Sequence, residues 1–292
     1  MGCCTGREDV KGMGPHSKAS YSKLDAHFAA DSKVLIETDP ENSASNRNSA
    51  EFLKKGKPAY LDFCKSEKLY SELIDSINDP CEVINPKVHI GWSTKPTTIG
   101  SLSLVYLCKV CRENPEEIMP FLYPVLPTLV ENIKNGTEDV RDSSLMLLYY
   151  VLDYASEEIF IQLLELQIFT VLMRSIMCSQ QELRHLTAGV CYKIYKDRPY
   201  AQKIFIEMKG GSQLVQQISW SSENDMVLKT LLDYLSELLQ DKDDMVMKEY
   251  ISKLNKDNAI DIIRDISNTD KSTETLEAMD YLITLLTEDN KD

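Results

Sequence analysis

The stretch KGGSQLVQQISWSSENDMVLKTLLDYLSELL, residues 209–239, contains the pattern that decides the fold. In its first and last thirds, leucine, valine and isoleucine recur every three or four residues, which is the spacing of a helix with one apolar face. The polar residues 221–225 separate these two thirds, and a glycine pair precedes the first. The stretch therefore predicts two packed helices joined by a short turn.

The second of these helices has counterparts at nearly regular intervals. IGSLSLVYLCKVC begins at residue 99, VRDSSLMLLYYVL at 140, LRHLTAGVCYKIY at 183 and VLKTLLDYLSELL at 227. Each begins with an aliphatic residue and is apolar at offsets 5 and 8, and a fifth copy, AMDYLITLL, follows. The offset-8 residues are Leu107, Leu148, Cys191, Leu235 and Leu282, which lie 41, 43, 44 and 47 residues apart.

A further apolar helix is predicted between successive copies, in FLYPVLPTLVENI, IFTVLMRSIM and GGSQLVQQI, and KLYSELIDSI precedes the first copy. Helices with one apolar face bury it when units of fixed length stack on each other. No sustained alternation of period two is present. We therefore predict an all-α α-solenoid, a right-handed superhelix without a sheet, that begins near residue 50.

The unit at 209–239 resembles an armadillo repeat: a glycine pair, a Leu-Val helix, a short polar turn and a longer helix. The resemblance covers roughly residues 50–286, with HEAT repeats of similar period as the alternative. It implies a protein-binding superhelix. We expect DKDDMVMKEYISKLNKD, residues 241–257, to form an extended connection before an incomplete last unit that acts as a cap.

The composition divides the chain into two regions. Residues 1–49 are rich in Gly, Ser, Asp, Asn and Lys, which predicts a flexible N-terminal segment before a repeat domain at 50–292. The net charge is −14, and residues 221–292 carry 18 acidic and 8 basic residues, so that this part accounts for −10. A chain this acidic is not expected to bind nucleic acid, which requires Lys and Arg to neutralise phosphates.

Motifs of enzyme active sites are not found. The four histidines are not paired with Cys, Ser or carboxylates in a catalytic pattern, and neither a phosphate-binding glycine loop nor HExxH occurs. We expect no catalytic residues and no cofactor. Cys108 and Cys111 match CxxC, but no second ligand pair follows at a zinc spacing. On a helix both would share the side of Leu104 and Leu107, so we expect core packing and no metal.

The armadillo resemblance implies that the third helix of each unit lines a concave, peptide-binding groove. In importin-α-like members, Trp and Asn four residues apart form a ladder there. The positions of the Trp residues are occupied by Val105, Met146, Gly189 and Asp233. Those of the Asn residues are occupied by Lys109, Tyr150, Lys193 and Glu237. The importin-type ladder is therefore absent.

We expect Lys109, Tyr150 and Lys193 to line the groove one above another, exposed, with Ser101, Asp142 and His185 two turns earlier on the same faces. Two lysines that flank a tyrosine suit an acidic or aromatic segment, as in β-catenin-like grooves. The alternative is that these residues are solvated polar positions without a partner.

The sequence begins with MGCCTGR. A disulfide or metal pair, a chance run and a lipid attachment site are the three interpretations. Gly2 is the residue that N-myristoylation requires, although position 6 is Gly where Ser or Thr is favoured. Cys3 and Cys4 lie where a membrane-bound chain would present thiols for palmitoylation. Such an N-terminus before armadillo repeats resembles acylated armadillo proteins that tether vacuoles or secretory organelles and recruit adaptors.

We therefore expect a membrane-anchored scaffold that recruits protein partners to a membrane or organelle surface, on the cytoplasmic face. The alternative is a soluble cytosolic regulator that binds a kinase, a chaperone or a cytoskeletal partner. Residues 160–173, FIQLLELQIFTVLM, are the longest apolar stretch, and Gln162, Glu165 and Gln167 interrupt it, so we expect no membrane-spanning helix.

Overall fold

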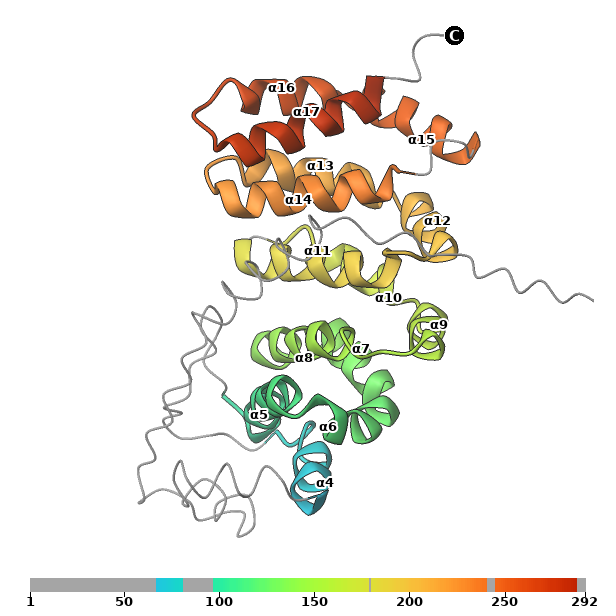
Figure 1. The fold of residues 1–292 in the computed structure, drawn as a ribbon. Coiled ribbons are helices and arrows are strands. Elements are labelled where there is room, and N and C mark those ends of the chain that lie inside the picture. The colour runs from blue at the N-terminus through green and yellow to red at the C-terminus, as the bar shows by residue number, and fades with distance from the viewer. Residues whose placement is uncertain (1–66, 81–96, 179, 241–244, 288–292) are drawn as a thin grey trace, which may run out of the picture.

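The chain is a stack of α-helices without a β-strand in the residues that the structure describes (Figure 1). The structure is a computed structural model, and it describes residues 67–80, 97–178, 180–240 and 245–287. Segment 1–49, its boundary near residue 50 and the lipidation residues Gly2, Cys3 and Cys4 lie outside this part. The prediction of an all-α solenoid is confirmed.

Within the described residues, four complete units follow one another, each with a first, a second and a third helix. The first helices are α6 (Pro115–Leu122), α9 (Glu157–Glu165), α12 (Pro199–Glu207) and α15 (Met245–Lys256). The second helices are α7 (Leu126–Asn135), α10 (Ile168–Ser175), α13 (Gly210–Trp220) and α16 (Ala259–Ser267). The third helices are α8 (Glu138–Val151), α11 (Gln181–Tyr195), α14 (Asp225–Leu238) and α17 (Thr273–Thr287).

An earlier third helix, α5 (Ile99–Glu113), packs against α8 and against α4 (Glu67–Asp75), which lies within the predicted helix KLYSELIDSI. Within the first complete unit, Pro124 and Pro127 divide the predicted helix FLYPVLPTLVENI. A short 3₁₀ helix, η1 (Tyr123–Val125), separates α6 from α7 there. Proline at position 124 lacks the N–H that a continuous α-helix would need, so the chain bends at this point.

The register of the repeats is the predicted one. Third helices contact each other in the order α5, α8, α11, α14, α17, and their offset-8 residues point into the core. These residues are Leu107, Leu148, Cys191, Leu235 and Leu282, and each is 0% exposed. A repeating apolar position therefore becomes one continuous core along the stack.

The glycine pair of residues 210–211 is needed at two close contacts, one within its own unit and one with the next unit. A Cβ atom on Gly210 would lie 2.4 Å from the Phe205 ring, and one on Gly211 would lie 2.4 Å from the Tyr250 hydroxyl. The Gly211 N–H donates a hydrogen bond of 2.7 Å to that hydroxyl. Glycine thus lets the start of α13 contact the first helix of the next unit.

The expectation for residues 241–257 is wrong. Residues 245–256 form α15, which packs against α16 and α17 and is the first helix of a complete last unit. Its apolar face includes Met247, Tyr250 and Leu254, all of them buried. The charged residues around these positions cover the solvent side of α15, so the segment is a helix of the stack. No described helix has the length and apolar character that a membrane span requires.

Candidate protein-binding surface on the third helices

Lys109, Tyr150 and Lys193 lie at equivalent positions near the C-terminal ends of α5, α8 and α11. All three are partly exposed. The Lys109 ammonium is 3.9 Å from Glu113, a weak surface ion pair within α5. The guanidinium of Arg112 lies 5.6 Å from the centre of the Tyr150 ring, so the end of α5 touches the end of α8.

Lys193 is more enclosed than the sequence suggests, because only 11% of its side chain is exposed. Its Nζ donates hydrogen bonds to the Tyr149 carbonyl at 3.1 Å and to Asp153 Oδ1 at 2.5 Å. The same ammonium is 3.4 Å from the centre of the Tyr149 ring. A desolvated cation above an aromatic face is strongly held, so Lys193 joins α11 to α8 in addition to bordering the surface.

The third helices form a row, and Gly189 of α11, in the middle of that row, is covered by tyrosine side chains. A Cβ atom at Gly189 would be 3.0 Å from the Tyr149 ring and 3.5 Å from the Tyr234 hydroxyl. The Tyr192 ring stacks on Tyr234 with their centres 4.2 Å apart. The position that carries tryptophan in importin-type grooves is therefore filled here by rings from both flanking third helices.

Ser101, Asp142 and His185 do not line the surface, in contrast to the expectation. Each is at most 7% exposed. Ser101 takes part in the N-terminal capping box of α5 with Thr98, Asp142 pairs with Arg141 at 2.8 Å, and His185 Nε2 is 2.9 Å from Ser221 Oγ. These polar groups are buried together with partners, as most buried polar groups are.

On α14, the face that corresponds to the Lys109, Tyr150 and Lys193 positions is partly exposed to solvent. The side chains of Lys229 and Asp233 are 27% and 36% exposed and form an ion pair of 2.9 Å. Burial raises the pKa of Asp233, against the opposing effect of Lys229. Burial also raises the pKa of Glu237, which Lys196 opposes. The row of third helices thus changes from a covered face at α8 and α11 to an acidic, more open face at α14.

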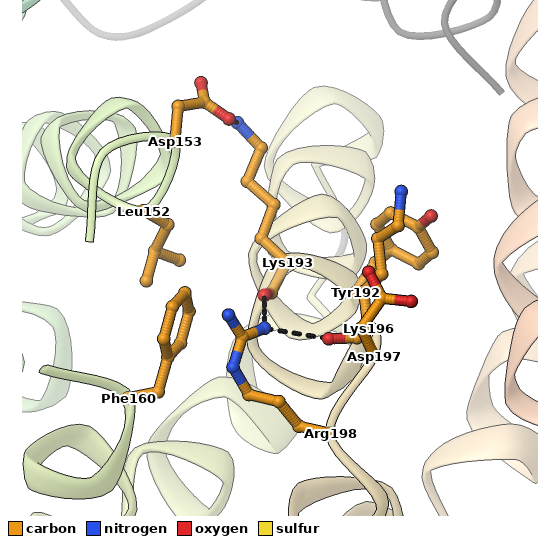
Figure 2. A pocket seen from close by; sticks show the side chains of 8 residues that line it. All are labelled: Leu152, Asp153, Phe160, Tyr192, Lys193, Lys196, Asp197 and Arg198. Carbon is orange, nitrogen blue, oxygen red and sulfur yellow. Dashed lines mark hydrogen bonds and ion pairs between the residues drawn. The ribbon is translucent and has the colours of Figure 1, made fainter. Parts of the chain in front are cut away.

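A cavity of about 320 Å³ lies beside Lys193, at the C-terminal ends of α8 and α11 (Figure 2). Its lining consists of Leu152, Asp153, Phe160, Tyr192, Lys193, Lys196, Asp197 and Arg198. Figure 2 shows Arg198 beside Phe160, with its Nη1 donating to the carbonyls of Lys193 and Lys196 at 3.2 and 2.8 Å. The positive charge of Arg198 is stabilised there by the backbone carbonyls at the C-terminal end of α11.

Sequence reasoning missed Tyr149, Asp153, Phe160 and Arg198, which surround the cavity or Lys193. One signal existed, because Tyr149 and Lys193 are 44 residues apart, one repeat length, and so face each other across a unit boundary. The turn after α11, residues 196–198 with the sequence Lys-Asp-Arg, has no comparable signal in the repeat pattern. Arg198 in this turn caps α11 by donating to the carbonyls of Lys193 and Lys196. The sequence does not show which carbonyls at the end of a helix are left without a partner.

The described residues contain no group of three or more His, Cys, Asp or Glu arranged to hold a metal ion. Cys108 and Cys111 are buried, as the core interpretation of the CxxC predicts. Burial raises the pKa of Cys108 well above its ordinary value and that of Cys111 to about 12, so both remain thiols rather than the thiolates that bind metal.

No model of a known protein family matches the sequence, and no curated protein matches it. Solved structures do match. The armadillo repeats only protein ARO from Plasmodium falciparum superposes with a TM-score of 0.69 at 17% identity, over 84% of this chain and 100% of that one. The fold is that of an armadillo-repeat solenoid.

Two further structures resemble the fold of this chain at low identity. A chain from a structure on the phosphorylation-controlled interaction between cadherin and β-catenin has a TM-score of 0.60 at 14% identity, over 83% of this chain and 43% of that one. The crystal structure of Uso1-2 has a TM-score of 0.57 at 13% identity, over 94% of this chain and 40% of that one. Each likeness concerns the fold alone.

Proposed function

We propose that this chain is a membrane-anchored armadillo-type scaffold that recruits protein partners to the cytoplasmic face of a membrane or organelle. The row of third helices is the observation that carries the partner-binding part, since it provides a long surface with charged and aromatic side chains. The cadherin–β-catenin structure concerns a protein–protein interaction, which supports protein binding as the function of such a surface. Gly2, Cys3 and Cys4 carry the anchoring part.

The proposed anchor needs two kinds of lipid. A single myristoyl chain on Gly2 binds a bilayer with an affinity of only about 10⁴ M⁻¹, which is reversible. A thioester-linked chain on Cys3 or Cys4 adds about 0.8 kcal/mol for each buried methylene. The basic residues of the first 23 positions are interspersed with acidic ones, so a polybasic patch does not replace the second lipid.

Membrane fractionation tests the anchor. We expect Gly2→Ala to shift the protein to the soluble fraction with neither lipid attached. We expect Cys3→Ser with Cys4→Ser to retain myristate, yet to release most of the protein, and hydroxylamine to have the same effect on the parent because it cleaves thioesters and spares amides. A parent that is soluble and incorporates no fatty acid label would support the soluble regulator of a kinase, chaperone or cytoskeletal protein instead.

Partner binding is tested best at Lys109. Lys193 also holds α8 and α11 together, so a change at Lys193 would alter stability and binding together. The ion pair of Lys109 with Glu113 lies within its own helix and is long, at 3.9 Å. We expect Lys109→Gln to reduce recovery of a partner that carries an acidic or aromatic segment, with unfolding unchanged. Lys134→Gln, on the exposed side of α7, removes the same charge and is the control. Equal recovery with both variants would exclude Lys109 from the interface.

A further inference from the structure

Exposed apolar side chains gather on the first helices α9 and α12, away from the third-helix row. Seven large apolar side chains among the described residues are at least 37% exposed, and four of them belong to this part of the stack. They are Tyr154, Ile161, Tyr200 and Ile204, exposed by 48%, 47%, 40% and 37%. Single exposed apolar residues are ordinary, whereas a group on one surface marks an interaction site.

Hydrogen bonds fix the first turns of α9 and α12 against each other. The Tyr200 hydroxyl donates to the Glu157 carboxylate, and Arg198 Nε donates to the same carboxylate at 3.0 Å. Ile161 lies one helical turn after Glu157, and Ile204 lies one turn after Tyr200. Residues four apart share a helix face, so Ile161 lies on the face of α9 that carries Glu157, and Ile204 lies on the face of α12 that carries Tyr200. Figure 1 shows α9 and α12 as neighbours along one edge of the stack.

The charges around the two isoleucines are mostly negative. Helices α9 and α12 contain the exposed carboxylates Glu157, Glu158, Glu165 and Glu207. Lys203 is the basic residue of the two helices, so four acidic residues and one basic residue give a net charge of −3. The cations of the adjacent turn, Lys196 and Arg198, are directed elsewhere: Arg198 is paired with Glu157, and the Lys196 ammonium lies 5.6 Å from the centre of the Tyr192 ring. The exposed apolar residues are therefore bordered by carboxylates.

We propose that α9 and α12 dock a basic amphipathic helix of a partner protein. An apolar stripe on such a helix would cover Ile161 and Ile204, and Lys or Arg on either side of the stripe would pair with the bordering glutamates. A second copy of this chain does not fit, because the same surface would bring two helix pairs of charge −3 together. This surface is separate from the third-helix row and does not depend on membrane anchoring.

The probe for this proposal is a fluorescein-labelled Leu–Lys peptide of two heptads, with leucine at helical spacing on one face. Fluorescence anisotropy of the peptide is measured as the full chain is added. We expect saturable binding that a scrambled peptide of the same composition, or one with Glu in place of Lys, does not reproduce. Equal binding of the scrambled peptide would overturn the proposal, since it would indicate general attraction to an acidic protein.

Two pairs of substitutions locate the binding. We expect Ile161→Ser with Ile204→Ser to weaken binding by about tenfold, the effect of losing central apolar contacts. Met177→Ser with Tyr281→Ser alters apolar side chains of similar exposure elsewhere and should have no effect. A third variant, Glu158→Lys with Glu165→Lys, leaves the apolar residues intact and should also weaken binding. Parent-like affinity in the first and third variants would exclude α9 and α12 as the docking surface.

Discussion

At the scale of single residues, Lys109 and Lys193 occupy equivalent positions in two repeats but have different surroundings. Lys193 is bonded to the Tyr149 carbonyl and Asp153 and lies against the Tyr149 ring, whereas Lys109 has a long ion pair at the surface. We expect Lys193→Met, which keeps the apolar stem, to reduce the free energy of unfolding by about 1–2 kcal/mol. Urea denaturation measures the change.

Lys109→Met provides the matched comparison for Lys193. Exposed ion pairs contribute about 0–1 kcal/mol, so this variant should unfold within about 0.5 kcal/mol of the parent. Equal unfolding free energies for the two methionine variants would contradict the contribution of Lys193 to the contact between α8 and α11.

Asp139 links two repeats through a carboxylate that is ionised in the folded protein. It accepts hydrogen bonds from the Thr97 N–H and hydroxyl at 2.9 and 2.8 Å and from the Thr137 hydroxyl at 2.7 Å. Burial raises its pKa, but these hydrogen bonds outweigh burial and lower the pKa to about 2, from an ordinary value of 3.8. The ionised form is thus favoured by folding.

The lowered pKa of Asp139 determines how the free energy of unfolding changes with pH. A carboxyl group whose folded pKa is below its unfolded value stabilises the protein above the unfolded pKa, and this contribution is lost as the pH falls through the folded value. We expect parent and Asp139→Asn to differ most in unfolding free energy above pH 4 and to converge as the pH approaches 2. Thermal unfolding across this range measures the difference. A constant difference down to pH 2 would contradict the assignment to Asp139.

At the scale of elements, three of the first helices are followed by a residue in the left-handed backbone conformation, and in none of the three is that residue glycine. Gln167, Lys209 and Asn258 have φ values of 55°, 63° and 63° at the junction between first and second helix. Side chains with a Cβ are strained in this left-handed region, and asparagine tolerates it better than glutamine or lysine. The repeated geometry shows that the turn is set by the packing of the two helices.

Glycine at these junctions should increase stability. We expect Lys209→Gly to increase the free energy of unfolding by about 0.5–1 kcal/mol, because glycine adopts positive φ without steric cost. Asn258→Gly should give a smaller gain, since asparagine already suits the conformation. Chemical denaturation measures both. A loss of stability in Lys209→Gly would show that the side-chain stem of the exposed Lys209 contributes more than the strain costs.

At the scale of the whole molecule, a solenoid transmits damage mainly to neighbouring units. Leu148 and Leu282 have the same offset and are both 0% exposed, but Leu148 lies in the first complete unit with helices on either side, and Leu282 lies in the last. An unpaired buried carboxylate costs several kcal/mol. We expect Leu148→Asp to unfold the central units and Leu282→Asp to unfold only the last.

Hydrogen exchange resolved by peptide distinguishes these outcomes. In Leu282→Asp, α15 to α17 should lose protection while α8 and α11 keep theirs. In Leu148→Asp, α5, α8 and α11 should all lose protection. Loss of protection along the entire chain in both variants would show a single cooperative unit instead of a stack with separable ends.

The repeat fold follows from the sequence because each unit repeats its own apolar pattern. Leu107, Leu148, Cys191, Leu235 and Leu282 could be aligned by offset alone, and all are core residues. An apolar helix face has to be buried, and a fixed repeat length leaves stacking as the means to bury it. The placement of Lys109 and Tyr150 at a partly exposed row of third helices follows from the same register.

The surroundings of individual side chains were decided by tertiary structure. Lys109 and Lys193 occupy equivalent positions in the sequence repeats, but the tertiary structure places Lys193 against a tyrosine ring and an aspartate from the preceding unit. Gly189 is covered because Tyr149 and Tyr234, which are 40 and 45 residues away in the sequence, extend over it from both flanking helices. Register determines which helix face points inward, whereas the contacts of a side chain depend on the size and rotation of neighbours in adjacent units.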